Sequence, residues 1–326
     1  MTKANHHPRV PNPPSALARR KPLPSQMPKP AEEDADAPRR IEAILRSPNY
    51  LRADEDTAFF ARDEMRGVRL QTEYFKAELL LEEHHVQHTI VVFGSTRICE
   101  PATARRNVEA LRAALLVRPG DEELARQLKI AERIQEKSHF YEVARAFGRL
   151  VSEENRKRHH DHTLIMTGGG PGIMEAANRG AFDAKAKTIG LNISLPHEQY
   201  PNPYISPELC LSFRYFALRK MHFLMRAKAL VAFPGGYGTF DEVFEVLALI
   251  QTRKIKPIPV VLVGEDYWRR AVDFDFLVDE GAIDAEDRDL FWFAETAEDI
   301  WNDILHWHSA SGEPLHRTSL SHLPDV

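Results

Sequence analysis

The sequence predicts an α/β fold built on a mainly parallel sheet with helices on both faces. Short apolar and β-branched runs, such as 89–93, 163–167 and 258–263, alternate along the chain with longer amphipathic stretches. Strands that are apolar at nearly every position are typical of parallel sheets covered on both sides. Glycine-containing turns follow several of the predicted strands, and ligands of such sheets bind at the carboxyl ends of strands. These turns are therefore expected to meet at one crevice.

Length and composition are those of an ordinary globular protein. The chain has 326 residues, a hydrophobic fraction of 43% and a formal net charge of −5, which gives no basic footprint for nucleic acid. Its two cysteines, Cys99 and Cys210, are too few for a disulfide framework. No segment is long and apolar enough to cross a membrane, and the first residues lack the apolar core of a secretory signal. We expect a cytoplasmic protein without nucleic-acid or membrane partners.

Four regions are predicted along the chain. Residues 1–40 are rich in proline and contain an acidic run at 32–34, so a disordered tail is expected, with a P-x-x-P docking segment as the alternative. Residues 41–88 have apolar residues every three to four positions and are predicted to form a helical extension. The α/β domain is assigned to 89–308, and 309–326 is expected to be a flexible tail.

Within the α/β domain, hydrophobic periodicity and turn residues place the individual elements. The strands are predicted at 89–93, 163–167, 188–193, 208–212, 229–233 and 258–263. The helices are predicted at 102–117, 121–158, from the second glycine turn to 186, and at 213–228, 239–252, 267–279 and 297–307. The proline-rich segment 194–207 is long enough to be a lid or a rim of a site.

Two groups of histidines precede the first two strands. They are His84, His85 and His88, and His159, His160 and His162. Neither group has cysteines or carboxylates at the spacing of a zinc site, which normally needs a full set of ligands. The sequence therefore predicts linker residues here and no metal ion.

The first two glycine turns are candidates for contact with a ligand. Gly94 and Ser95 follow the first strand, where a simple tight turn is an equally good explanation. The glycines of the second turn are Gly168, Gly169, Gly170 and Gly172. So many glycines before a helix cost backbone entropy, which favours close approach by a ligand over a bare turn. Glu175 and Asn178, one turn into that helix, could reach the crevice or lie on a solvated face.

The third glycine turn, Pro234-Gly-Gly-Tyr-Gly238, joins a strand to a helix predicted to start at Thr239. A glycine loop followed by a helix N-terminus is suited to hold an anion. The loop lacks the Lys-Ser/Thr pair of a P-loop and the G-x-G-x-x-G spacing of a dinucleotide site. Glu242 would lie beside the anion, but the series from Thr239 to Glu242 also matches a capping box, which needs no chemistry.

These residues together resemble a known family. Gly235, Gly236, Gly238, Thr239 and Glu242 complete the P-G-G-x-G-T-x-x-E signature of the Lonely Guy (LOG) family, often labelled "lysine decarboxylase-like". Arg219 and Lys220, which by pattern alone would lie on a solvated face, precede it at the spacing of that family's Arg-Lys pair. The run 168–175 resembles the glycine motif of longer-chain members. The similarity covers roughly residues 89–275.

The resemblance implies a Rossmann-like, doubly wound fold and a phosphoribohydrolase, working as a homodimer or larger homo-oligomer. Such enzymes cut the N-glycosidic bond of a nucleoside 5′-monophosphate, such as AMP or a cytokinin riboside monophosphate, to free base and ribose 5-phosphate. The family's catalytic Arg and Glu fall on Arg219 and Glu242. No cofactor is expected, because the Ser-x-His-Lys run usual in pyridoxal phosphate decarboxylases is absent.

We therefore expect the glycine turns, with Lys220 and Thr239, to bind the phosphate and Glu242 to stabilise positive charge on the ribose or to activate water. Arg219 is expected to hold the phosphate or a ribose hydroxyl. Phe216-Ala217-Leu218 replaces the Met-His-Glu that often precedes the family's Arg-Lys pair. The alternative class is a protein that binds a nucleotide or molybdenum cofactor without cleaving it. Release of free base from nucleoside monophosphates would discriminate the two.

Overall fold

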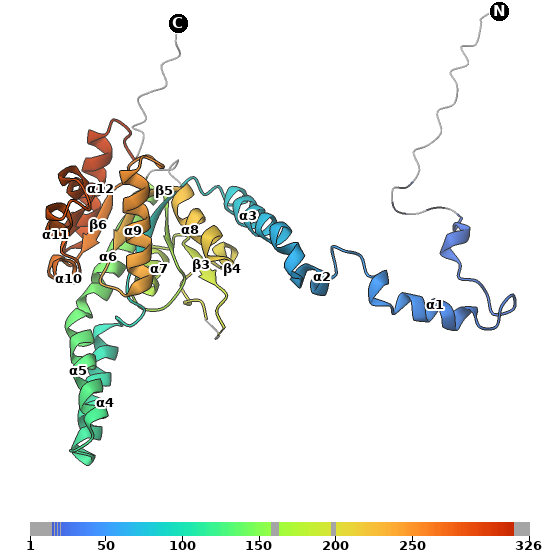
Figure 1. The fold of residues 1–326 in the computed structure, drawn as a ribbon, viewed down its shortest axis with the longest axis horizontal. Coiled ribbons are helices and arrows are strands. Elements are labelled where there is room, and N and C mark those ends of the chain that lie inside the picture. Colours follow the sequence, from blue (N-terminus) through green and yellow to red (C-terminus); the bar gives the residue numbers. More distant parts are fainter. Residues whose placement is uncertain are drawn as a thin grey trace, which may run out of the picture. The chain divides into compact units, whose positions relative to one another are not determined.

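The computed structural model describes Ser15, Leu17, Arg19 and residues 21–157, 163–196 and 200–315. The chain divides into two compact units, residues 1–67 and 68–326. This division falls inside the predicted helical extension, 21 residues earlier than the boundary expected at 88/89. The second unit contains all of the sheet and is shown in Figure 1.

The first unit consists of short helices joined by turns. Its α-helices are α1 (Ala37–Leu45) and α2 (Thr57–Ala61), and its 3-10 turns are Pro24–Gln26, Pro48–Tyr50 and Asp63–Met65. The proline-rich region thus contains a 3-10 turn and the start of a helix in its described part, whereas 41–65 is broken into several pieces. Among its described residues only Ala37 is buried, so this unit has almost no core of its own.

A single seven-stranded parallel sheet forms the centre of the second unit, with the strand order β4-β3-β2-β1-β5-β6-β7. The strands are β1 (His88–Phe93), β2 (Thr163–Thr167), β3 (Ile189–Ile193), β4 (Cys210–Phe213), β5 (Ala227–Ala232), β6 (Val260–Val263) and β7 (Trp292–Ala294). The order reverses direction between β1 and β5. This is the topological switch point at which open α/β sheets bind ligands.

Helices cover both faces of the sheet, which confirms the doubly wound α/β prediction. One core contains side chains of α6 (His139–Lys157), α7 (Ile173–Asp183) and α12 (Ala297–Ala310) packed on one face. The other contains side chains of α3 (Arg66–Glu83), α8 (Phe216–Met225), α9 (Tyr237–Gln251), α10 (Glu265–Ala271) and α11 (Phe274–Asp279). Successive residues of β1, such as Ile90 and Val91, enter opposite cores, as the two-residue period of a strand requires.

Two helices predicted as continuous are broken. The helix expected at 121–158 is α5 (Glu122–Lys137) followed by α6, with Ser138 donating its hydroxyl to the carbonyl of Gln135 at the break. The helix expected at 267–279 is α10 followed by α11, where the Asp273 side chain accepts the N–H of Phe276 and starts a new helix. The sequence analysis also missed β7. The hydrophobic periodicity of the sequence continues through both helix breaks, so only the hydrogen bonds at the breaks reveal them.

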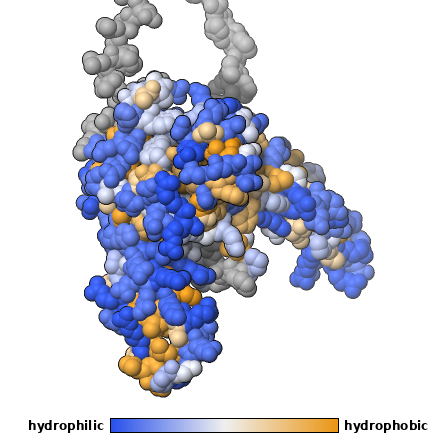
Figure 2. Space-filling model, turned by 60° about the vertical axis from the view of Figure 1, so that its left-hand side comes forward, coloured by the Kyte–Doolittle hydropathy of each residue, from blue (hydrophilic) through white to orange (hydrophobic). Residues whose placement is uncertain are grey.

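Between β1 and β2 the chain forms a helical hairpin of α4 (Pro101–Val117) and α5 that extends away from the sheet (Figure 1). Arg112 of α4 and Glu132 of α5 form an ion pair at 2.7 Å. Leu116 and Val117 near the turn are 82% and 81% exposed, and Figure 2 shows hydrophobic surface at this lower end. The base of the hairpin, by contrast, borders the crevice described below.

No helix in the described part of the chain is at once long enough and apolar enough to span a membrane. Nor do the described residues include a group of three or more His, Cys, Asp or Glu arranged to hold a metal ion. His84, His85 and His88 belong to that part of the chain. His159, His160 and His162 lie outside it.

Candidate active site

A cavity of about 880 Å³ opens at the carboxyl ends of the central strands, at the switch point of the sheet. Its lining includes the turns after β1 and β5, the first turns of α9, Arg219 of α8 and one face of α5. Of the residues singled out in the sequence, Gly94, Ser95, Gly168, Arg219, Gly235, Gly236, Gly238, Thr239 and Glu242 line it. Gly169, Gly170, Gly172 and Lys220 do not.

Glu242 is a buried carboxyl group that borders this cavity. Its residue exposure is 6%, and burial raises its pKa to about 7, although the charges of Lys220 and Arg219 act in the opposite direction. The capping-box alternative is wrong. Helix α9 begins at Tyr237, two residues before Thr239, and no side chain caps its start. Glu242 therefore lies one turn deeper in the helix than a capping residue would.

Arg219 joins the carboxyl ends of two strands. Its Nε donates to the Leu191 carbonyl at 2.7 Å and its Nη2 to the Gly168 carbonyl at 3.2 Å. The guanidinium also lies 5.1 Å from the centre of the Phe223 ring. Burial lowers the pKa of Arg219, while the nearby Glu242 carboxylate raises it. The side chain is thus held at the cavity with two of its five N–H donors already used on backbone oxygens.

Lys220 is not among the residues that line the cavity. Its ammonium forms ion pairs with Asp241 at 2.9 Å and with Glu245 at 3.0 Å, and the side chain is only 17% exposed. Burial lowers the pKa of Lys220, but the hydrogen bonds to these two carboxylates outweigh burial and raise it overall. Lys220 thus connects α8 to α9 through ion pairs, and it lies near enough to Glu242 to lower the pKa of that carboxyl group.

Helix α8, which carries both residues, is held at each end by α3. The Glu73 carboxylate accepts the backbone N–H groups of Arg214 and Tyr215, each at 3.0 Å, at the start of α8. At the other end, Glu78 forms a two-point ion pair with Arg226, at 2.6 and 3.0 Å. The negative charge of Glu73 near the N-terminus of α8 interacts favourably with the helix dipole. Helix α3 therefore helps to position Arg219.

The loop between β5 and α9 is open towards the cavity. At Gly236 and Gly238 an added Cβ would meet nothing within 4 Å. At Gly235 it would lie 2.1 Å from the Thr239 hydroxyl, so only glycine fits there. The Gly235 carbonyl accepts a hydrogen bond from the hydroxyl of Tyr267, which also lines the cavity. The loop is thereby anchored at Gly235, while Gly236 and Gly238 face open space.

The turn after β1 connects the two other glycine turns. The N–H of Ser95 donates to the Pro234 carbonyl at 2.9 Å, and its carbonyl accepts from the N–H of Ile173 at 3.1 Å. An added Cβ at Gly94 would lie 2.7 Å from Ile173. Gly94 and Ser95 therefore line the cavity and also determine how closely α7 and the loop after β5 approach each other.

Apart from Gly168, which lines the cavity, the glycines of the second turn do not border it. Gly169 and Gly172 have φ angles of 74° and 75°, which L side chains rarely adopt. A Cβ would lie 2.0 Å from the Asn192 amide oxygen at Gly169 and 2.3 Å from the Ser95 carbonyl oxygen at Gly172. The Gly170 carbonyl accepts from Asn202 at 3.1 Å. Backbone conformation and close packing thus account for Gly169 and Gly172 without a ligand.

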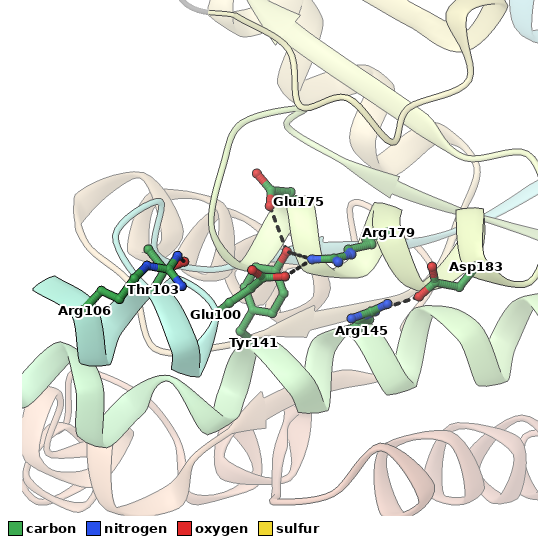
Figure 3. Close-up of polar contacts among 8 residues, drawn as sticks. All are labelled: Glu100, Thr103, Arg106, Tyr141, Arg145, Glu175, Arg179 and Asp183. Atoms are coloured by element: carbon green, nitrogen blue, oxygen red, sulfur yellow. Dashed lines mark hydrogen bonds and ion pairs between the residues drawn. The ribbon is translucent and has the colours of Figure 1, made fainter.

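Glu175 belongs to a separate network of polar side chains (Figure 3). It accepts a hydrogen bond from the Tyr141 hydroxyl at 2.8 Å, and Arg179 ion-pairs with Glu100 beside them. Burial and the bond to Glu175 raise the pKa of Tyr141. Asn178 is fully buried and donates to Thr188 at 2.6 Å. Both residues therefore hold α7 in place, and neither lines the cavity.

The sequence analysis missed the contribution of α5. Ile130, Arg133, Ile134 and Lys137 all line the cavity, and their spacing of three and four residues places them on one face of the helix. Ile130 is 38% exposed, because the cavity borders this face of the helix. The alternation of apolar and basic residues along this face was a usable signal, because a purely packed face would not contain Arg133 and Lys137.

The sequence matches a protein family described as "Possible lysine decarboxylase" over residues 174–304. It is 31% identical over 141 residues to a probable cytokinin riboside 5′-monophosphate phosphoribohydrolase, LOG4, of Oryza sativa subsp. japonica. It is 30% identical over 142 residues to the cytokinin riboside 5′-monophosphate phosphoribohydrolase LOG3 of Arabidopsis thaliana. Both matches cover 42% of this chain, and they span 60% and 64% of those relatives.

Among solved structures, the molybdenum cofactor carrier protein of Chlamydomonas reinhardtii is 18% identical, with a TM-score of 0.37. That alignment covers 67% of this chain and 96% of the carrier protein. A likeness of this strength carries no information about function. The family match over residues 174–304, in contrast, includes the Arg-Lys pair and the P-G-G-x-G-T-x-x-E motif. Over residues 174–304 the chain is therefore similar to the family described as possible lysine decarboxylase, and it is also similar to the LOG phosphoribohydrolases of rice and Arabidopsis.

Proposed function

We propose that this protein is a nucleoside 5′-monophosphate phosphoribohydrolase, which hydrolyses the N-glycosidic bond to free base and ribose 5-phosphate. The observation that carries the proposal is a buried carboxyl group, Glu242, with its pKa raised to about 7 at the edge of the switch-point cavity. A catalytic acid–base group works best when its pKa lies near the operating pH. The relatives named above as cytokinin riboside 5′-monophosphate phosphoribohydrolases support the same reaction.

The mechanism follows from the charge that develops in the reaction. Departure of the base leaves an oxocarbenium-like ribose, which a carboxylate close to the anomeric carbon stabilises. In the proposed mechanism the ionised Glu242 supplies that charge or accepts a proton from the attacking water. The open backbone N–H groups of Gly236 and Gly238, with the Thr239 hydroxyl, bind the phosphate at the N-terminus of α9. Holding the phosphate fixes the ribose relative to Glu242.

In this proposal Arg219 holds the carboxyl ends of β2 and β3 together at the cavity and donates its remaining N–H groups to a ribose hydroxyl. Its hydrogen bonds to the Leu191 and Gly168 carbonyls give it a fixed orientation, which suits a group that positions substrate. On the strength of the family resemblance we further propose AMP or a cytokinin riboside monophosphate as substrate and a homodimer or larger homo-oligomer. We also propose a cytoplasmic location, because the two cysteines are too few for a disulfide framework. The assignment requires no cofactor.

The test is release of free base from a panel of nucleoside monophosphates, followed by chromatography. We expect adenine from AMP, and we expect Glu242→Gln to lower kcat by about 10²–10⁴-fold while AMP still binds, because one acid–base group contributes about that much. Below pH 7 the rate should fall as Glu242 becomes protonated. Binding of nucleotides without base release would instead support a carrier, and full activity of Glu242→Gln would remove Glu242 from the mechanism.

A further inference from the structure

A nucleotide phosphate requires more positive charge than the glycine loop provides. A phosphate monoester carries close to two negative charges at neutral pH. The N-terminus of α9 offers only about half of one positive charge. Unlike a P-loop, the segment Pro234–Thr239 contains no lysine. Side chains from elsewhere in the fold must therefore supply the remaining charge if this cavity binds a phosphate.

The two cations of the Arg-Lys pair are already engaged. Lys220 is ion-paired with Asp241 and Glu245 and does not line the cavity. Arg219 lines the cavity, but it donates to two backbone carbonyls, and the Glu242 carboxyl lies close enough to shift its pKa. At neutral pH a partly ionised Glu242 offsets part of its charge. The motif residues alone thus leave the phosphate largely uncompensated.

Three other cations line the cavity: Arg97 after β1, and Arg133 and Lys137 of α5. In the described part of the chain no carboxylate forms an ion pair with any of them. Lys137 makes one hydrogen bond, to the Arg133 carbonyl at 3.1 Å, which leaves two of its three donors. On the outer part of the same hairpin, Arg112 and Arg126 are instead paired with carboxylates at 2.7 Å.

We infer that Arg133 and Lys137 are phosphate-binding residues that determine the preference for a nucleoside 5′-monophosphate over the nucleoside, with Arg97 assisting them. This inference rests on the proposed function. It names α5, and not the Arg-Lys pair, as the main source of positive charge for the phosphate. The phosphate lies between the N-terminus of α9 and the basic face of α5, where it receives backbone N–H groups from one side and side-chain cations from the other. Helix α5 thereby makes the site select a nucleoside 5′-monophosphate over the nucleoside.

The experiment compares kcat/KM for AMP and for adenosine in the full-length Arg133→Ala, Lys137→Ala and double variants. Lys129→Ala is the matched control, because Lys129 is an exposed cation of the same helix that does not line the cavity. We expect each single variant to lose about tenfold in preference for AMP over adenosine, and the double variant about a hundredfold, through KM rather than kcat. Lys129→Ala and the adenosine reaction should stay within twofold of the parent. Arg133→Lys, which keeps the charge, should recover most of the preference.

Calorimetric titration of AMP and of inorganic phosphate separates this inference from the proposed function. If the parent protein binds AMP and the double variant does not, the inference is supported, whether or not any protein releases base. If none of the proteins releases base, only the hydrolase proposal fails. Normal base release by a double variant that binds AMP within twofold of the parent overturns the inference and leaves the hydrolase intact. An equal loss for AMP and adenosine, or a parent protein that binds neither AMP nor phosphate, also overturns it.

Discussion

Two glycine turns that look alike in sequence, one after β2 and one after β5, have different roles in this protein. In the turn after β2, added methyl groups at Gly169 and Gly172 would collide with the Asn192 side chain and the Ser95 carbonyl. In the turn after β5, added methyl groups at Gly236 and Gly238 would meet open space beside the cavity. The first turn is needed for packing between strands, and the second leaves room for a ligand.

The glutamates that follow the two turns differ in the same way. Glu175 accepts a hydrogen bond from Tyr141 within a network that fastens α7 (Figure 3). Glu242 borders the cavity, and its pKa is raised to about 7 by burial. A motif of glycines followed by a glutamate therefore indicates a ligand site only when the turn faces open space. The three predictions below test this contrast between a packed and an open turn.

The largest effect is expected for Gly172→Ala in the packed turn. The substitution forces a side chain into a backbone conformation with positive φ and places its Cβ 2.3 Å from a backbone oxygen. Positive φ costs about 1–2 kcal/mol and overpacking about 1–3 kcal/mol, so the free energy of unfolding should fall by about 2–5 kcal/mol. Chemical denaturation measures it. A loss below about 1 kcal/mol would show that the turn is not packed as described.

A smaller effect, dependent on pH, is expected for Glu242→Gln. Because the folded pKa is raised to about 7, the folded protein favours the protonated carboxyl. Its contribution to stability is complete below the unfolded pKa of about 4.3 and is lost as pH rises through 7. The Gln variant cannot ionise, so it should match the parent near pH 4.5 and exceed it by up to about 3 kcal/mol at pH 8.

Denaturation at a series of pH values between 4.5 and 8 is the measurement. A stability difference between Glu242→Gln and the parent that does not change with pH would contradict the raised pKa. The expected outcome, a variant that is more stable and less active, would identify a residue kept for chemistry at the expense of folding.

The smallest effect on stability is expected for Gly238→Ala in the open turn. Gly238 lies inside α9, where alanine is favoured over glycine by about 1 kcal/mol, and its methyl group would meet no protein atom within 4 Å. The melting temperature should stay the same or rise, while the KM for AMP increases because the methyl group enters the cavity. If Gly238→Ala destabilises the fold as much as Gly172→Ala, the distinction between the two turns is lost.

The strand–turn–helix alternation was predicted correctly because it depends on neighbours in the sequence. The continuous apolar character of β1 and β5 indicated burial on both faces, and the all-parallel sheet confirms it. Helix boundaries were less accurate. The helix after the third glycine turn, for instance, was predicted to start at Thr239, although α9 starts at Tyr237. A capping pattern of four residues can occur by chance inside a helix, and only the backbone shows where the helix starts.

By itself the sequence determined the fold class, the order of the central elements and the residues of the family motifs, since these follow from local periodicity and turn chemistry. The tertiary structure alone decided which of those residues meet at the cavity. It placed Gly172 against Ser95, ion-paired Lys220 with Glu245 and brought Lys137 of α5 to the site. The physical reason is that burial, ion pairing and an open cavity depend on contacts between segments far apart in the chain, which no local pattern specifies.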